Sequence, residues 1–219
     1  MIKWRANAQG HRMKITFTRH GESQANVLQE VSNRGLKHPL TPAGRQQAAS
    51  LADSLQSQAV THIYCSPVLR AIETAVILAG QLAVDYVVVD ALREYDMGVR
   101  EGRSDPGVWQ AWFDVLEAWK NPARWGERVE GGESFYDVRQ RFVPFIDRLI
   151  QAHGKNEAHL VCVGHYGLYQ MMLPLILSNI DETLITRLGG LSYTACIITE
   201  LTPSGLVCTS WNGVPVNHR

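Results

Sequence analysis

Five side chains that suit phosphate chemistry are spread widely along this 219-residue chain. They are two arginines, two histidines and one carboxylate: Arg19, His20, Arg70, Glu94 and His165. Guanidinium groups match phosphate oxygens with paired hydrogen bonds. A neutral imidazole can attack phosphorus, and a carboxylic acid can protonate the leaving oxygen and then accept a proton from water. If the five converge, the sequence carries a site for phosphoryl transfer.

A short β-like run precedes each of these residues. Arg19-His20-Gly21 follows the run 13–18, Arg70 follows 61–65, Glu94 follows 86–89 and Leu92, and Gly164-His165 follows 160–163. In an open parallel sheet, ligands bind at the carboxyl edge of the strands. If the four runs lie in one parallel sheet, we therefore expect one pocket at that edge. Ser66-Pro67 predicts a helix start with Ser66 as N-cap, and its free N–H groups would face the same pocket.

Longer helical patterns alternate with these runs. Helices are predicted from Thr41-Pro42 through Leu55, over 68–82, from Ser134 through Ile150, and through 171–177. In the third of these, Asp137 is the capping-box partner of Ser134, and Pro144 lies inside the helix. A hairpin is predicted to join 195–201 to 206–211. Strand–helix alternation of this kind favours an α/β fold. We expect a three-layer sandwich with a mostly parallel sheet, helices on both faces and a small inserted lid.

The lid is predicted at residues 96–132, inside a single domain that covers 1–219. It contains Trp109, Trp112, Trp119 and Trp125, four of the six tryptophans in the chain. The first three are spaced so that they fall on one helix face. They can pack in the core or stack on a substrate, and the sequence leaves both interpretations open.

The overall charge offers no long-range attraction for polyanions. The 21 Lys and Arg residues balance 21 Asp and Glu residues, and the isoelectric point is near 7.1. We therefore expect no nucleic-acid or membrane partner and a phosphate site that is built locally. Residues 1–12 lack an apolar leader-like run, and the apolar stretch at 171–177 is too short to span a bilayer, so we expect a cytoplasmic protein.

Metal binding is not predicted. The cysteines Cys65, Cys162, Cys196 and Cys208 form no CxxC pair and no zinc-like spacing with histidine. They are expected to be free thiols, with Cys65 and Cys162 in apolar runs. No ordered cluster of carboxylates suits Mg²⁺.

Six motifs occur in order along most of the chain. They are Arg19-His20-Gly21-Glu22-Ser23 with Asn26, Pro39-Leu40-Thr41 with Gly44, Ser66-Pro67 with Arg70 and Thr74-Ala75, Leu92 and Glu94 with Gly98 and Glu101-Gly102, Gly131-Gly132-Glu133-Ser134, and Gly164-His165. Together they resemble the histidine phosphatase superfamily, specifically its phosphoglycerate mutase-like branch, and the first is similar to the "RHG" signature of that family.

The resemblance implies a role for each of the five residues. His20 would attack phosphorus in line and become phosphohistidine. Arg19, Arg70 and His165 would hold the phosphate oxygens. Glu94 would act first as general acid and then as general base. No metal or other cofactor is implied, except a 2,3-bisphosphoglycerate primer if the protein is a mutase.

Substrate contacts are implied for Asn26, Ser23 and Gly167. The family commonly has a small glycine directly after the second histidine, whereas here Tyr166 comes first and Gly167 second. A bulky residue at that position could narrow the pocket or move a backbone donor.

Three functions fit these residues. The preferred one is a metal-independent phosphomonoesterase that acts on a small phosphorylated substrate. The second is a phosphoglycerate mutase that uses the same phosphohistidine, but the segment 96–132 has no Arg-Arg pair of the kind that the family's mutases usually carry. The third is a non-catalytic phosphate-binding module, which would need no nucleophile and proton donor together. The physiological substrate and the oligomeric state stay open.

Overall fold

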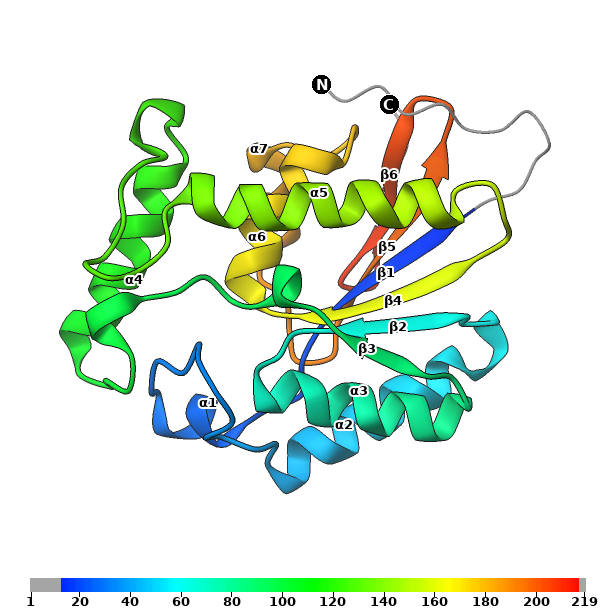
Figure 1. Ribbon diagram of the computed structural model, residues 1–219, viewed down its shortest axis with the longest axis horizontal. Helices are drawn as coiled ribbons and strands as arrows, with labels where there is room; N and C mark the ends of the chain where they lie inside the picture. Colours follow the sequence, from blue (N-terminus) through cyan, green and yellow to red (C-terminus); the bar gives the residue numbers. More distant parts are fainter. Residues whose placement is uncertain (1–12, 217–219) are drawn as a thin grey trace.

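A seven-stranded mixed sheet organises the protein, in the order β3-β2-β4-β1-β5-β6-β7. The computed structural model describes residues 13–216, so the expectation about residues 1–12 lies outside the described part. Strands β3, β2, β4 and β1 run parallel to one another, and β5, β6 and β7 continue the sheet in antiparallel pairing (Figure 1).

The element bounds follow the predicted alternation. The strands are β1 (Lys14–Arg19), β2 (His62–Cys65), β3 (Tyr86–Val88), β4 (His159–Gly164), β5 (Cys196–Thr202), β6 (Gly205–Trp211) and β7 (Val214–Pro215). The α-helices are α1 (Gln24–Leu28), α2 (Pro42–Leu55), α3 (Leu69–Leu82), α4 (Pro106–Trp119), α5 (Phe135–His153), α6 (Tyr166–Ile176) and α7 (Glu182–Leu188). Short 3₁₀ turns lie at Gln56–Gln58, Asp90–Leu92, Gly98–Arg100 and Pro122–Arg124.

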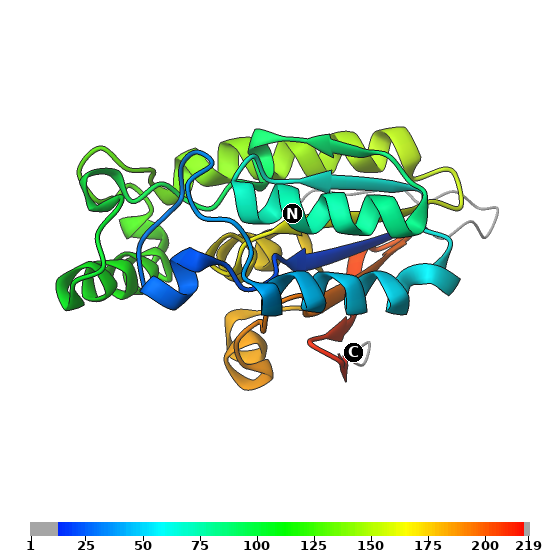
Figure 2. The same cartoon turned by 90° about the horizontal axis from the view of Figure 1, so that it is seen from below.

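Two helical layers sandwich the sheet, as predicted. Strand β4 is buried along its whole length. Its side chains alternate between the layers: Val161 and Val163 join the core under α2 and α3, whereas Leu160 and Cys162 join the core under α5 and α6. Figure 2 shows α2 and α3 along one face, and α5 lies across the other in Figure 1. The three-layer α/β fold is therefore confirmed.

Two local features differ from the prediction. The sheet is parallel only in its β3-β2-β4-β1 half, because the hairpin β5–β6 pairs with β1 antiparallel. Helix α3 begins at Leu69 with Val68 as N-cap, so Ser66 is not the N-cap. The Ser66 hydroxyl instead accepts the Val68 N–H (3.2 Å) and contacts His165.

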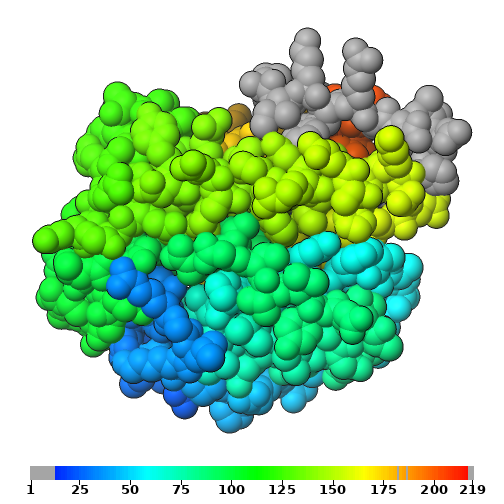
Figure 3. Space-filling view, in the orientation of Figure 1, coloured from blue at the N-terminus to red at the C-terminus, as the bar shows by residue number. Residues whose placement is uncertain are grey.

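The segment 96–132 packs beyond the carboxyl edge of the parallel strands and beside the loop that follows α1 (Figures 1 and 3). Trp119 is only 1% exposed and packs on Tyr95 and Phe135, so it belongs to the core. Trp109 is half-buried, and its Nε1–H donates to the Gln29 carbonyl (3.0 Å), which ties α4 to the α1 loop.

Candidate active site

The residues predicted to converge do meet at one edge of the sheet. His20 follows β1, His165 follows β4 and caps α6, and Arg70 lies in the first turn of α3. Glu94 lies two residues after the 3₁₀ turn that follows β3. The His20 and His165 ring centroids are 5.1 Å apart, and Arg70 hydrogen-bonds to both rings.

The His20 ring is held with a lone pair on Nε2. Its Nδ1–H donates to the Gly21 carbonyl (2.7 Å), so Nε2 is the acceptor, and Arg70 Nε donates to it (2.9 Å). The side chain is buried. Burial, followed by the charges of Arg70 and Arg19, holds the pKa of His20 well below its usual range. At neutral pH this imidazole is therefore uncharged, with its lone pair on Nε2.

Arg70 organises the interior of the site. Its guanidinium donates to His20, to the Ser32 carbonyl (2.5 Å) and to His165 Nδ1 (3.2 Å). Because Nδ1 of His165 accepts, its Nε2–H donates to the Ser66 hydroxyl (2.8 Å). Burial lowers the pKa of Arg70 to about 10, so it stays cationic at neutral pH. Burial and then the Arg70 charge hold the pKa of His165 well below its usual range.

Arg19 is held from a different direction. Its Nη1 donates to the Leu191 carbonyl (2.9 Å), and its guanidinium carbon lies 4.2 Å from the centre of the Tyr193 ring. The centre of the Tyr166 ring lies 5.9 Å from the same carbon. A guanidinium over aromatic faces is attracted to the ring electrons. Two aromatic rings and a backbone carbonyl therefore hold the Arg19 guanidinium at the site.

Glu94 is 4% exposed, and backbone N–H groups bind both of its oxygens. Tyr95 N–H donates to Oε1 (3.1 Å) and Gly167 N–H donates to Oε2 (2.9 Å). Burial raises the pKa of Glu94, whereas these two amides and the Arg70 charge oppose the rise. The carboxyl is thus fixed in place, and burial favours its uncharged form while these contacts favour the carboxylate.

A cavity of about 210 Å³ opens over these groups. Its lining includes Arg19, His20, Arg70 and Glu94, together with the aromatic side chains Trp109, Trp112, Phe113 and Tyr166. Two arginines, an uncharged imidazole and a protonatable carboxyl at the base of an aromatic cavity can bind a phosphate group, attack it and protonate what leaves.

Comparison with known proteins identifies the family of this chain. The family model described as "Histidine phosphatase superfamily (branch 1)" matches residues 15–213. The chain belongs to the histidine phosphatase superfamily.

Two curated members of the superfamily are 32% identical to this chain. Fructose-2,6-bisphosphatase TIGAR B of Danio rerio matches over 151 residues, 64% of this chain and 56% of that protein. Probable phosphoglycerate mutase GpmB of Enterobacter sp. (strain 638) matches over 132 residues, 59% of each chain. The chain thus spans about half the length of the curated relatives it matches.

Solved structures of similar fold cover nearly the whole molecule. A mycobacterial glucosyl-3-phosphoglycerate phosphatase superposes with a TM-score of 0.75 at 23% identity, over 92% of this chain and 99% of that one. "Mycobacterial hydrolase 1" superposes with a TM-score of 0.78 at 23% identity, over 92% of this chain and 99% of that one.

The three residues predicted to contact substrate occupy different positions in this member of the superfamily. Asn26 lines the cavity. Ser23 is fully buried, and its N–H and hydroxyl both donate to Asn26 Oδ1 (3.0 and 2.8 Å), so it supports Asn26 from behind. Gly167 gives its N–H to Glu94, and a Cβ there would lie 2.9 Å from Tyr95 Cε1 and 3.0 Å from the Glu94 oxygens. Both therefore serve as supports for groups that face the cavity.

Several functional contacts were missed by the sequence reasoning. The Ser32 and Leu191 carbonyls anchor the two arginines, but backbone acceptors in loops leave no residue-type signal. Tyr193 could have been singled out only as an aromatic residue before β5. Ser66 is predicted from the sequence as an N-cap before Pro67, whereas its hydroxyl contacts His165 in the structure.

Within residues 13–216, no three His, Cys, Asp or Glu side chains are grouped so that they could hold a metal ion. None of the helices in that part of the chain is long and apolar enough to cross a membrane. The four cysteines are free thiols, and Cys65 and Cys162 are fully buried as predicted.

Proposed function

We propose that the protein is a metal-independent phosphomonoesterase that works through phosphohistidine at His20. The observation that carries this proposal is that His20 is buried and uncharged, with a lone pair on Nε2. That lone pair faces the Arg70 guanidinium at 2.9 Å. A purely phosphate-binding site would gain more from a cationic side chain at that point than from a neutral nucleophile.

In the first half-reaction, a phosphomonoester dianion binds between Arg19 and Arg70. Arg70 then donates to phosphate oxygens, which releases the lone pair on His20 Nε2. That lone pair forms the N–P bond as the P–O bond to the leaving group breaks. The electron pair of the broken bond stays on the leaving oxygen, which takes the proton from the Glu94 carboxyl.

In the second half-reaction, the Glu94 carboxylate accepts a proton from a water molecule. The water oxygen forms a bond to phosphorus, and the N–P bond breaks with its electron pair returning to His20 Nε2. Inorganic phosphate leaves, and His20 is again uncharged and Glu94 again protonated. The two arginines stabilise the oxygen charges in both steps, and His165 positions Arg70 by accepting its Nη2–H at Nδ1, so no metal is needed in this scheme.

The cavity lining favours hydrolysis over the mutase alternative. Arg19 and Arg70 are the only cations among the described residues that line it, and Glu30 and Glu94 also line it. A phosphoglycerate mutase must hold a carboxylate in addition to phosphate, which calls for further positive charge. The aromatic walls Trp109, Trp112 and Phe113 instead suit a less charged leaving group.

The proposal is tested with phosphate release from a panel of phosphomonoesters by metal-free protein, and with interconversion of 3- and 2-phosphoglycerate with and without 2,3-bisphosphoglycerate. We expect phosphate release, little interconversion, and loss of turnover in His20→Ala. His62→Ala is the matched control, since His62 is exposed on β2. Wild-type-like hydrolysis by His20→Ala would refute the mechanism, and rapid primer-dependent interconversion would show a mutase.

A further inference from the structure

Glu101 belongs to the Glu101-Gly102 motif, which plays no part in the scheme above. It lies in the lid segment, directly after the 3₁₀ turn Gly98–Arg100. Its carboxylate accepts the Asn33 N–H at both oxygens (3.1 and 3.0 Å) and the Arg34 N–H at Oε1 (3.2 Å). Glu101 therefore holds the backbone of the loop that follows α1, which runs beside the lid (Figure 1).

The peptide group between Ser32 and Asn33 connects Glu101 to the catalytic cavity. The carbonyl of this peptide accepts the Arg70 Nη1–H (2.5 Å), and its N–H is one of the two that Glu101 binds. In a planar trans peptide the C=O and the N–H point in opposite directions. The Glu101 carboxylate and the Arg70 guanidinium therefore lie on opposite sides of one peptide group, and both residues of that peptide are buried.

The charges on the two sides favour the observed orientation of this peptide. Its partially negative oxygen faces a guanidinium and its partially positive N–H faces a carboxylate, so both contacts are attractive and reinforce each other. If the peptide turned over, each end would face a charge of its own sign. Glu101 thus fixes the direction of the carbonyl that anchors Arg70.

The anchored atom of Arg70 leaves the reactive edge of the guanidinium free to face the site. Nη1 is bound to the Ser32 carbonyl, whereas Nε donates to His20 (2.9 Å) and Nη2 donates to His165 (3.2 Å). Nε–H and Nη2–H form the side-on fork that binds two oxygens of a phosphate. The direction of this fork depends on where Nη1 is held.

A second contact ties the same loop to the lid without involving this peptide. Arg34 Nε and Nη2 donate to the two Asp96 carboxylate oxygens (2.8 and 2.7 Å). Glu101 differs from this ion pair because it binds the peptide that Arg70 also binds. The two contacts therefore allow loop attachment and Arg70 orientation to be separated by experiment.

We propose that Glu101 is a positioning residue for phosphate binding: by fixing the Ser32–Asn33 peptide, it aims the Nε–Nη2 edge of Arg70 at the phosphate. The inference rests on the proposed function, because it takes Arg70 as a phosphate ligand. Its predicted effect is opposite in sign to that of charge alone. Removing a carboxylate near an anion site strengthens anion binding through the electric field, whereas losing the Glu101 contact should weaken it.

The test is the Kd of inorganic phosphate, measured by calorimetry on wild type and three variants of Glu101. Glu101→Gln keeps an acceptor oxygen at full length without the charge, so Kd should change by less than about threefold. Glu101→Asp keeps the charge but is one methylene shorter, and Glu101→Ala has neither. Both should raise Kd by about tenfold, as loss of one charge-assisted hydrogen bond would give. If Glu101→Ala does not fold, the Gln and Asp variants decide the test.

Arg34→Gln is the matched control, because it breaks the ion pair with Asp96 and leaves the Ser32–Asn33 peptide in place. Its phosphate Kd should stay within about threefold of wild type. Equal losses of affinity in Glu101→Ala and Arg34→Gln would show a general attachment of the loop and overturn the proposal. Tighter binding in Glu101→Ala, or affinity kept in Glu101→Asp and lost in Glu101→Gln, would show a field effect and overturn it as well.

The NMR resonance of the Arg70 Nε–H gives a second readout that needs no bound phosphate. Donation to His20 Nε2 should place this proton at one position in wild type, Glu101→Gln and Arg34→Gln. The resonance should move in Glu101→Asp and Glu101→Ala, because the guanidinium is no longer held at Nη1. An unmoved resonance in both of these variants would overturn the positioning role.

Turnover of p-nitrophenyl phosphate, measured on the same samples, separates this inference from the proposed function. Absence of His20-dependent turnover in wild type would refute the phosphatase mechanism, and the phosphate Kd values and the Arg70 resonance would still decide the role of Glu101. His20-dependent turnover with equal phosphate Kd in wild type, Glu101→Asp and Glu101→Ala would leave the mechanism intact and refute the positioning role alone.

Discussion

Replacing Glu94 by Gln should separate substrates by the basicity of their leaving groups. An alkoxide must be protonated as it departs, whereas p-nitrophenolate leaves readily as an anion. A positioned general acid contributes roughly 10²- to 10⁴-fold to rate. We therefore expect the single-turnover rate of phosphohistidine formation to fall by about that factor for an alkyl phosphate and by less than about tenfold for p-nitrophenyl phosphate.

The structure also sets the stability of this variant. Both Glu94 oxygens accept backbone N–H groups, from Tyr95 and Gly167. A Gln amide can accept only at its oxygen, so one buried N–H would face the amide NH₂ group. Leaving one buried donor without an acceptor costs about 1–3 kcal/mol of unfolding free energy. Glu94→Gln should therefore unfold at lower denaturant concentration and still fold.

The assay that isolates the acid role is rapid-quench kinetics with both substrates. Because Glu94 also activates water in the proposed mechanism, Glu94→Gln should release a burst of about one equivalent of p-nitrophenolate per site and accumulate phosphohistidine. The alkyl phosphate should give no burst. Glu133→Gln is the control: Glu133 pairs with Arg93 and Arg141 outside the cavity, so it should slow neither substrate selectively. Equal losses of single-turnover rate on both substrates in Glu94→Gln would refute the general-acid assignment.

Two further predictions concern the histidines. Ser66→Ala removes the acceptor of the His165 Nε2–H, so kcat/KM for phosphomonoesters should fall by about tenfold while p-nitrophenyl and alkyl phosphates are affected alike. Because the pKa values of buried His20 and His165 are held below those of the unfolded chain, the unfolded state binds more protons in acid. The free energy of unfolding, measured with urea, should therefore include the full contribution of both histidines above about pH 6.5. As the pH is lowered from there, it should decrease by up to about 1.4 kcal/mol per pH unit for each histidine. A flat profile between about pH 6.5 and pH 5 would contradict the burial argument.

The sequence predicts which side chains meet at the site, but it does not predict the backbone groups that hold those side chains in place. His20, Arg70, Glu94 and His165 could be placed together because strand ends have a fixed geometry in a parallel sheet. The anchor of Arg19 could not be foreseen: it is the Leu191 carbonyl, which reaches the site only because β5 pairs antiparallel with β1. Hydrophobic patterns predict that a strand exists, but they do not reveal its neighbour or direction.

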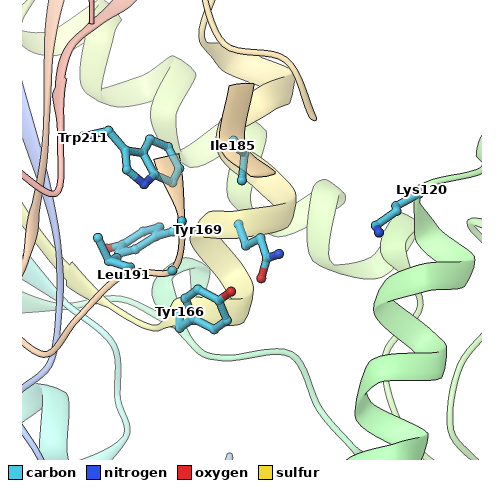
Figure 4. A pocket seen from close by; sticks show the side chains of 9 residues that line it. Lys120, Tyr166, Tyr169, Ile185, Leu191 and Trp211 are labelled. Atoms are coloured by element: carbon cyan, nitrogen blue, oxygen red, sulfur yellow. The ribbon is translucent and has the colours of Figure 1, made fainter. Parts of the chain in front are cut away.

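The order Tyr166-Gly167 lets the start of α6 contact two cavities and Glu94. Tyr166 is the first residue of α6, and it lines both the catalytic cavity and a neighbouring cavity that Lys120, Ile185 and Trp211 also line (Figure 4). Gly167 follows, and its N–H reaches Glu94 because no Cβ pushes Tyr95 or the carboxyl away. Successive helix positions differ by about 100° in direction, so the ring and the amide can point to different partners from adjacent residues. A departure from the family pattern thus places an aromatic side chain next to Gly167 without displacing the Glu94 carboxyl that Gly167 holds.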